Sequence, residues 1–137
     1  MANLTTTRMA VILPAANVKK FLKYFGAYAP HFHRTTLNSS EVIESRNGKT
    51  LLMIDCSCDW SFQYSLYDPN TNNPDVIGLK QACSECGVSK ISVRSEEESS
   101  SFYEFLNYDE DDAFWDYEVL DRPRNPEDLY LDEEDDE

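Results

Sequence analysis

Residues 52–66 alternate between apolar and polar side chains, which is the pattern of a β-strand with one buried face. The positions between the apolar ones are polar except for Met53. A run of fifteen residues is long for one strand, so we expect a bend or a bulge near its middle. The apolar positions are Leu52, Ile54, Cys56, Cys58, Trp60, Phe62, Tyr64 and Leu66. The chain therefore has to build a sheet whose apolar face is covered by other elements.

Further strands are predicted on both sides of this run. Residues 6–13 read as one strand, and residues 88–94 read as another. Asn47-Gly48 lies between the strand-like residues 42–46 and the start of the long strand. An Asn-Gly pair in this position predicts a two-residue hairpin, because a type I′ turn requires positive φ at both central residues.

Two helices are predicted between the strands. An apolar face with the spacing i, i+3, i+4, i+7 runs from Val18 to Phe25, and Gly26 ends it. Residues 75–86 show a second apolar helical face, and Gly87 ends that helix. The order of elements is therefore β-α-β-β-α-β. We predict an α+β fold, namely a ferredoxin-like antiparallel sheet with two helices on one face.

Charge divides the chain into two unlike parts. Residues 1–95 hold ten bases and seven acids, residues 96–137 hold two bases and nineteen acids, and the whole chain has a net charge of −14. Phosphate contacts need Lys and Arg, so this charge disfavours direct binding of DNA or RNA and docking to an anionic membrane. The sequence has no apolar run of the ~18–20 residues that a membrane-spanning helix needs.

The acidic third of the chain is also rich in aromatic residues between positions 102 and 120. Disordered acidic tails are poor in aromatics, so we expect this segment to pack on the preceding domain. The predicted organisation is a ferredoxin-like domain in residues 1–95, an acidic aromatic-rich extension in 96–120 and a looser acidic tail in 121–137.

The first 95 residues resemble the small YubB-like ferredoxin-like proteins that phages and plasmids carry. The resemblance lies in the strand, proline and helix from Arg8 to Phe25, in the Trp60 strand before the turn at Asp68-Pro69, and in the helix that ends at Cys86-Gly87 before a strand ending at Ser95 to Glu98. It implies the fold and the origin, and it carries over no activity and no functional residues. By composition, the chain also resembles phage DNA mimics that block restriction or CRISPR enzymes.

Acidic runs in the last third match the charge spacing of a nucleic acid strand. One DNA strand carries a charge every ~3.4 Å, and an extended protein chain rises ~3.3 Å per residue. Residues 132–137 are all acidic, and residues 109–112 repeat this over four positions. We predict that these acids, with neighbouring aromatic anchors, bind a partner. The predicted residues are Glu96, Glu97, Glu98, Glu104, Asp109, Glu110, Asp111, Asp112, Phe114, Trp115, Asp116, Tyr117, Glu118, Asp132, Glu133, Glu134, Asp135, Asp136 and Glu137.

The cysteines form one Cys-x-Cys and one Cys-x₂-Cys pair. Two such pairs can hold a tetrahedral zinc ion, so Cys56, Cys58, Cys83 and Cys86 are candidate ligands. Each pair also lies on the apolar face of its predicted strand or helix, and a free cysteine packs as a small hydrophobe. Buried free thiols are the favoured interpretation, zinc and disulfides stay open as alternatives, and no cofactor is predicted.

Catalytic motifs are not recognisable. The four glycines are spread singly, so neither a P-loop nor a dinucleotide-binding fingerprint can be assembled. We therefore expect no enzyme activity. The N-terminus has no recognisable secretory signal, so we expect the protein in the cytoplasm of the host bacterium.

Taken together, these features predict a phage- or plasmid-borne, non-enzymatic inhibitor of a host defence complex of the CRISPR or restriction type. Its acidic surface would mimic nucleic acid and bind a basic nucleic-acid-binding protein or ribonucleoprotein complex. One alternative is an acidic adaptor or assembly protein that binds a basic protein elsewhere. Another is a zinc-stabilised structural module.

Overall fold

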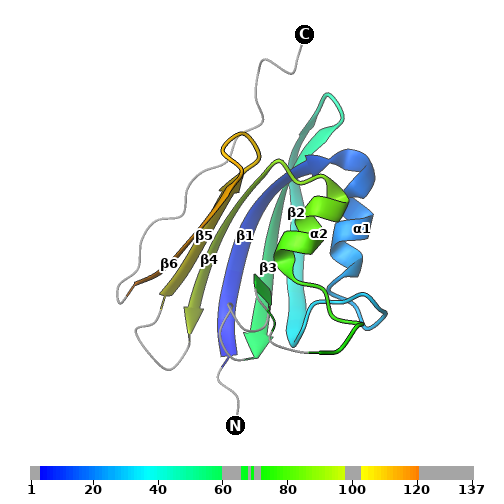
Figure 1. Ribbon diagram of the computed structural model, residues 1–137. Coiled ribbons are helices and arrows are strands. Elements are labelled where there is room, and N and C mark those ends of the chain that lie inside the picture. Colours follow the sequence, from blue (N-terminus) through cyan, green and yellow to red (C-terminus); the bar gives the residue numbers. More distant parts are fainter. Residues whose placement is uncertain (1–3, 60–65, 68, 70–71, 98–102, 121–137) are drawn as a thin grey trace.

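The computed structural model contains one sheet of six antiparallel strands in the order β2-β3-β1-β4-β5-β6 (Figure 1). The structure describes residues 4–59, 66–67, 69, 72–97 and 103–120. The strands are β1 (Leu4–Pro14), β2 (Thr35–Arg46), β3 (Lys49–Asp59), β4 (Lys90–Glu97), β5 (Tyr103–Asp109) and β6 (Phe114–Leu120).

Two short helices lie on one face of the sheet, on the side of β2 and β3, and leave β5 and β6 clear (Figure 1). The 3-10 turn η1 (Ala15–Asn17) leads from β1 into α1 (Val18–Lys23), and α2 (Leu79–Cys86) precedes β4. Phe21 of α1 and Leu79 of α2 are fully buried in one core cluster with strand residues such as Leu13 and Ile54. This packing accounts for the alternation along β3, because only one of its faces meets the helices. Neither helix in the described residues has the length and apolar character needed to cross a membrane.

Most of the predicted elements are confirmed where the structure describes them. The predicted strand 6–13 lies within β1, and Asn47 and Gly48 form the turn between β2 and β3 with φ values of 52° and 80°. Residues 60–65, the second half of the long predicted strand, lie outside the described residues.

The second helix begins later than predicted. It was expected from residue 75, whereas α2 starts at Leu79. Val76 instead forms a parallel bridge with His31, whose backbone N–H donates to the carbonyl of Asp75 at 2.8 Å. The Ile77 N–H donates to the carbonyl of His31 at 2.9 Å. These backbone hydrogen bonds to a distant loop keep residues 75–77 extended.

The predicted ferredoxin-like fold, with the element order β-α-β-β-α-β, is wrong, because the described residues form mostly a six-stranded antiparallel sheet with only two short helices. Residues 103–109 and 114–120 are not an appendage, because β5 and β6 continue the same sheet to six strands. β5 pairs with β4 along its whole length, from Tyr103 opposite Glu96 to Asp109 opposite Lys90. The physical reason is that β4 would otherwise be an edge, with one row of backbone hydrogen-bonding groups left unpaired. The fold class was therefore assigned from the first four strands, whereas the sheet has six.

Candidate functional site

The β5–β6 hairpin carries most of the predicted partner-binding residues that the structure describes. Its register is continuous, from Tyr103 opposite Leu120 to Asp109 opposite Phe114. Side chains alternate across a strand, so Leu106, Tyr108, Trp115 and Tyr117 share the face toward the helices, where they join the core cluster. Asn107, Asp109, Asp116 and Glu118 share the opposite face. We call this second side of the hairpin the open face.

The tip of the hairpin is held by hydrogen bonds to its own backbone and to the neighbouring loop. The Asp109 carboxylate accepts from the backbone N–H of Asp111 at 3.0 Å, and the Asp109 carbonyl accepts from the N–H groups of Asp112 and Ala113. The N–H of Glu110 donates to the carbonyl of Ser89 at 2.8 Å. Ala113 closes the turn with a φ of 53°. Asp109 therefore orders the turn, and the acids that follow it are presented from a defined backbone.

The acids of the tip and of β6 are largely exposed to solvent. Glu110, Asp111, Asp112 and Asp116 are exposed, and Asp109 is partly buried. Asp109 forms an ion pair of 3.8 Å with Lys90 of β4. In the part of the chain that the structure describes, no basic side chain forms an ion pair with the four exposed acids. Their negative charge is therefore available to an external partner.

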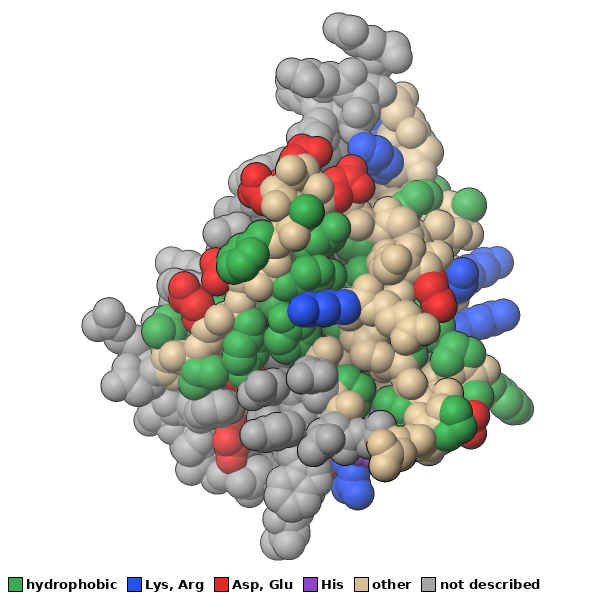
Figure 2. Space-filling model, in the orientation of Figure 1, with side chains coloured by type: hydrophobic (Ala, Val, Ile, Leu, Met, Phe, Trp, Pro, Cys, Tyr) green, Lys and Arg blue, Asp and Glu red, His purple; other side chains and the backbone are tan. Residues whose placement is uncertain are grey.

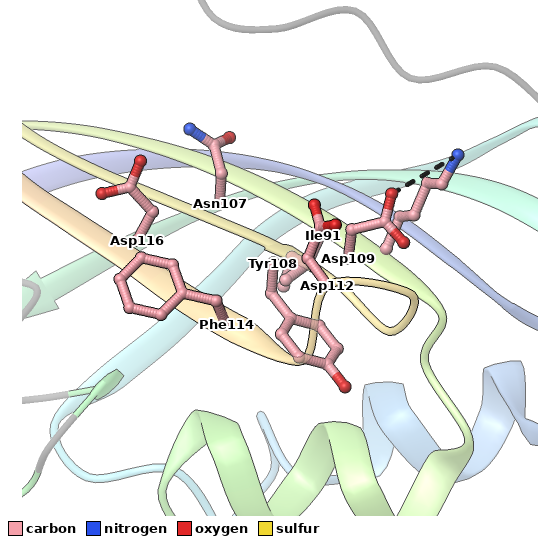
Figure 3. A pocket seen from close by; sticks show the side chains of 8 residues that line it. Ile91, Asn107, Tyr108, Asp109, Asp112, Phe114 and Asp116 are labelled. Atoms are coloured by element: carbon pink, nitrogen blue, oxygen red, sulfur yellow. Dashed lines mark ion pairs between the residues drawn. The ribbon is translucent and has the colours of Figure 1, made fainter.

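A cavity of about 270 Å³ lies among the acids at this end of the sheet. Figure 3 shows Asn107, Asp109 and Asp116 pointing away from the helices, whereas Tyr108 points toward them. The cavity is also lined by Asp112, Phe114, Lys90 and Ile91. The described residues contain no group of three or more His, Cys, Asp or Glu side chains placed to hold a metal ion. We therefore describe the cavity as a depression in an acidic surface and do not assign it as a cation site.

The helix side of the same hairpin is covered by stacked aromatic rings instead of a third helix. Tyr108 and Trp115 stack with ring centroids 4.3 Å apart, and Tyr67 stacks on Tyr117 at 5.2 Å. The ammonium group of Lys80 lies 5.3 Å from the centroid of Tyr67 and 5.9 Å from that of Trp115. We call Tyr67, Tyr108, Trp115 and Tyr117 the aromatic cluster. Figure 2 shows hydrophobic side chains gathered over these strands, with acidic side chains along their outer margin.

The aromatic anchors predicted from the sequence fall into two groups. Phe114 is 66% exposed at the start of β6 and remains free to contact a partner. Trp115 and Tyr117 are half-buried in the aromatic cluster, so they anchor the hairpin to the core as well as lining its surface. Sequence analysis did not single out Tyr67, Tyr108 or Lys80. The i, i+2 spacing of Leu106 and Tyr108 could have identified Tyr108, whereas Tyr67 and Lys80 are brought in by the fold.

The other predicted acids are not all part of this surface. Glu104 is only 1% exposed, because it faces the helix side of β5 and accepts a 2.6 Å hydrogen bond from the Tyr117 hydroxyl. Glu96 and Glu97 are at the end of β4 that is far from the hairpin tip. Glu118 is half-buried on β6. The predicted residues Glu98, Asp132, Glu133, Glu134, Asp135, Asp136 and Glu137 lie outside the described residues.

The expected burial of the four cysteines is confirmed. All four are free thiols, with exposures between 0% and 2%. Burial raises the pKa of the Cys83 and Cys86 thiols. A hydrogen bond from Cys56 lowers the pKa of Cys58, helped by hydroxyl contacts from Thr35 and Thr7 at 3.7 and 3.9 Å. The thiols thus form part of the core, where hydroxyls satisfy the sulfur atom of Cys58.

Comparisons of the chain with protein-family models, with curated proteins and with solved structures find no match. The function of the hairpin therefore has to be argued from its own geometry and charge.

Proposed function

We propose that this protein is a non-enzymatic inhibitor, carried by a phage or a plasmid, that acts in the cytoplasm of a host bacterium. It binds a basic nucleic-acid-binding protein or ribonucleoprotein complex of a restriction or CRISPR defence system. Carboxylates of the β5–β6 hairpin take the place of phosphates in the nucleic acid site of that partner. The observation that carries the proposal is a group of exposed acids on a hydrogen-bonded hairpin tip, none of which forms an ion pair with a basic side chain in the described residues.

The charge of the hairpin tip supports this proposal. Glu110, Asp111 and Asp112 are consecutive exposed acids at the tip, and Asp116 is exposed four residues further along, on β6. One DNA strand carries a phosphate every ~3.4 Å, so a protein that binds DNA presents closely spaced basic side chains. A compact group of four exposed carboxylates is complementary to such a surface, and the acidic residues 132–137 would add to the charge.

Pre-organisation supports the same proposal. An acidic loop that is unstructured before binding loses conformational entropy when a partner orders it. Here the Asp109 carboxylate and the Ser89 carbonyl already hold the tip in one conformation. Binding would be steered by charge, and it would weaken with salt because the Debye length falls from ~8 Å at physiological ionic strength to ~3 Å at 1 M.

The proposal is tested by neutralising the tip and leaving the turn intact. The variant Glu110→Gln/Asp111→Asn/Asp112→Asn removes three charges and spares Asp109, whose carboxylate orders the turn. A matched control, Glu41→Gln/Glu44→Gln/Asp75→Asn, removes three charges elsewhere. Each protein is immobilised, exposed to a bacterial lysate at low salt and then eluted with short duplex DNA or structured RNA.

We expect the native protein and the control to release nucleic-acid-binding proteins when the competitor is added, and the tip variant to capture far less of them. Proteins that stay bound despite the competitor would contradict the mimic and favour the adaptor alternative. Equal capture by the tip variant and the control would also contradict the proposal, because the tip charges would then be dispensable.

A further inference from the structure

A second cavity lies beside the helices and is larger than the one at the hairpin. Its volume is about 510 Å³, within the range of ~300–1,000 Å³ that is usual for small-molecule sites. Its walls come from the end of α1, from residues 28–30 of the loop that follows and from Glu85 of α2. It shares no lining residue with the hairpin cavity, so it is a separate candidate site.

Hydrogen bonds hold the walls of this cavity together. The Tyr24 hydroxyl donates to the Glu85 carboxylate at 2.8 Å, and the Lys20 ammonium group donates to the Glu85 backbone carbonyl at 3.2 Å. These two bonds tie α1 to α2. Beyond residues 28–30, the backbone N–H of Phe32 donates to the carbonyl of Tyr24 at 2.7 Å, which brings the loop back against α1. The cavity is therefore largely formed before a ligand arrives, which lowers the entropic cost of binding.

The charge around this cavity is opposite to the net charge of the chain. α1 contains three lysines and no acid, and Lys19, Lys20 and Lys23 are all exposed. In the part of the chain that the structure describes, none of these lysines forms an ion pair. Figure 2 shows basic side chains at the margin where α1 lies in Figure 1. Lys20 and Lys23 line the cavity, so they give it a positive side that would hold an anion.

The remaining lining residues favour a flat ring that carries an amino group. Tyr28 is 87% exposed and lines the cavity next to Ala29 and Pro30. An exposed aromatic ring can stack on any nucleobase. Glu85 adds an acceptor, because a carboxylate has about four lone-pair sites and this one accepts two hydrogen bonds in the described residues. It can therefore accept a further hydrogen bond from the amino group of a base.

The net charge of the chain limits how large the anion can be. A chain of net charge −14 repels a long polyanion, whose phosphates would extend beyond the lysines of α1. A ligand that fills only the cavity is affected mainly by charges within a Debye length, which is ~8 Å at physiological ionic strength. A single nucleotide therefore fits this site better than a strand of RNA or DNA does.

We propose that this cavity binds a nucleoside monophosphate. The base would stack on Tyr28 with its amino group toward Glu85, and the ammonium groups of Lys20 and Lys23 would hold the phosphate. Lys20 can do so while it bonds to the Glu85 carbonyl, because an ammonium group has three donors. This inference goes beyond the proposed function and does not depend on it, because the two sites have no residue in common.

Titration of the full chain with three probes, followed by amide chemical shifts in nuclear magnetic resonance, tests this inference. The probes are adenosine monophosphate, adenosine without the phosphate, and ribose 5-phosphate without the base. We expect adenosine monophosphate to bind one-to-one with a Kd below about 1 mM, and each partial probe to bind about tenfold more weakly. The shifts should centre on α1, on residues 28–30 and on the end of α2. A short oligoadenylate should bind no more tightly than the mononucleotide.

Two variants should each reproduce the loss of one part of the ligand. Lys23→Gln should bind adenosine monophosphate about as weakly as the native chain binds adenosine, and its binding of adenosine should not change. Tyr28→Ala should bind adenosine monophosphate about as weakly as the native chain binds ribose 5-phosphate. Lys19→Gln is the matched control, because it removes the same charge from the same helix and Lys19 does not line the cavity. It should change binding by less than about twofold. All three side chains are exposed, so the variants should remain folded.

Three outcomes would overturn the inference. The first is the absence of saturable shifts with adenosine monophosphate up to about 10 mM. The second is an equal effect of Lys19→Gln and Lys23→Gln, which would mean general attraction of anions to α1. The third is tighter binding of the oligoadenylate, which would assign the lysines to a nucleic acid strand. None of these outcomes bears on the proposed function, because the acids of the hairpin are not changed in this experiment.

Discussion

The hydroxyl of Tyr117 on β6 donates a 2.6 Å hydrogen bond to the carboxylate of Glu104 on β5, and that carboxylate is only 1% exposed. A buried carboxylate is costly unless polar groups satisfy it, so this bond fixes both the place of Glu104 and the position of β6 against β5. The hairpin that carries the exposed acids is therefore held together by a hydrogen bond to the buried acid Glu104.

Tyr117→Phe should lower the free energy of unfolding by about 1–3 kcal/mol, because it removes a hydrogen bond from a buried acceptor. Urea denaturation followed by circular dichroism would measure the loss. Tyr108→Phe is the matched control, since the described residues give the Tyr108 hydroxyl no hydrogen-bond partner and its ring stacks in the same cluster. Equal losses in the two variants would show that the hydroxyl bond to Glu104 has no special role.

Phe21→Ala should be among the most destabilising single changes. The Phe21 ring is fully buried and makes edge contacts with Tyr24, Phe25 and Phe32 at centroid distances of 6.1 to 6.4 Å. Removing it should lower the free energy of unfolding by about 3–5 kcal/mol. Tyr28→Ala removes an aromatic ring that is 87% exposed and should change stability by less than about 0.5 kcal/mol. Thermal and urea unfolding of both variants would test the contrast.

Gly87→Ala should destabilise the end of α2. Gly87 has a φ of 67°, and Val88 closes the cap by donating from its N–H to the carbonyl of Cys83 at 2.9 Å. A side chain in the left-handed region costs about 1 kcal/mol or more. Gly87→Asn should cost less, because asparagine tolerates this conformation better than alanine does. If both variants unfolded at the same urea concentration as the native protein, the left-handed cap would not matter to stability.

His33 should make stability fall as the pH is lowered. Burial lowers the pKa of His33, and the nearby Arg34 and His31 lower it further. The folded state therefore favours neutral His33, so its contribution is present above the ordinary histidine pKa of ~6.5 and is lost as the pH falls through the lower folded value. Carboxylates that are common to the native protein and to His33→Gln also titrate as the pH falls. The difference between the unfolding free energies of the two proteins, measured from about pH 6.5 downward, therefore isolates the contribution of His33. A difference that does not change with pH would contradict it.

Local patterns along the chain were sufficient to locate most of the regular structure. The alternation from Leu52 onward placed β3, the Asn47-Gly48 pair placed its hairpin, and the apolar face from Val18 to Phe25 placed α1. These signals are local because strand alternation and helical periodicity depend on a few neighbouring residues. The clustering of acids in residues 109–112 was equally visible, and the structure places them at the hairpin tip.

Tertiary structure decided how the elements join and which acids are exposed. An alternating pattern identifies a strand but does not specify which other strand it pairs with. The pairing of β5 with the edge of β4 could therefore not be predicted from residues 103–120. Glu104 and Asp116 are both acids in strands that alternate acids with aromatic residues, yet one is buried under Tyr117 and the other is exposed. Their difference depends on which face of the hairpin turns toward the helices. The sequence by itself therefore determined where the chain is extended, helical and acidic, and long-range strand pairing determined which of those charges a partner can reach.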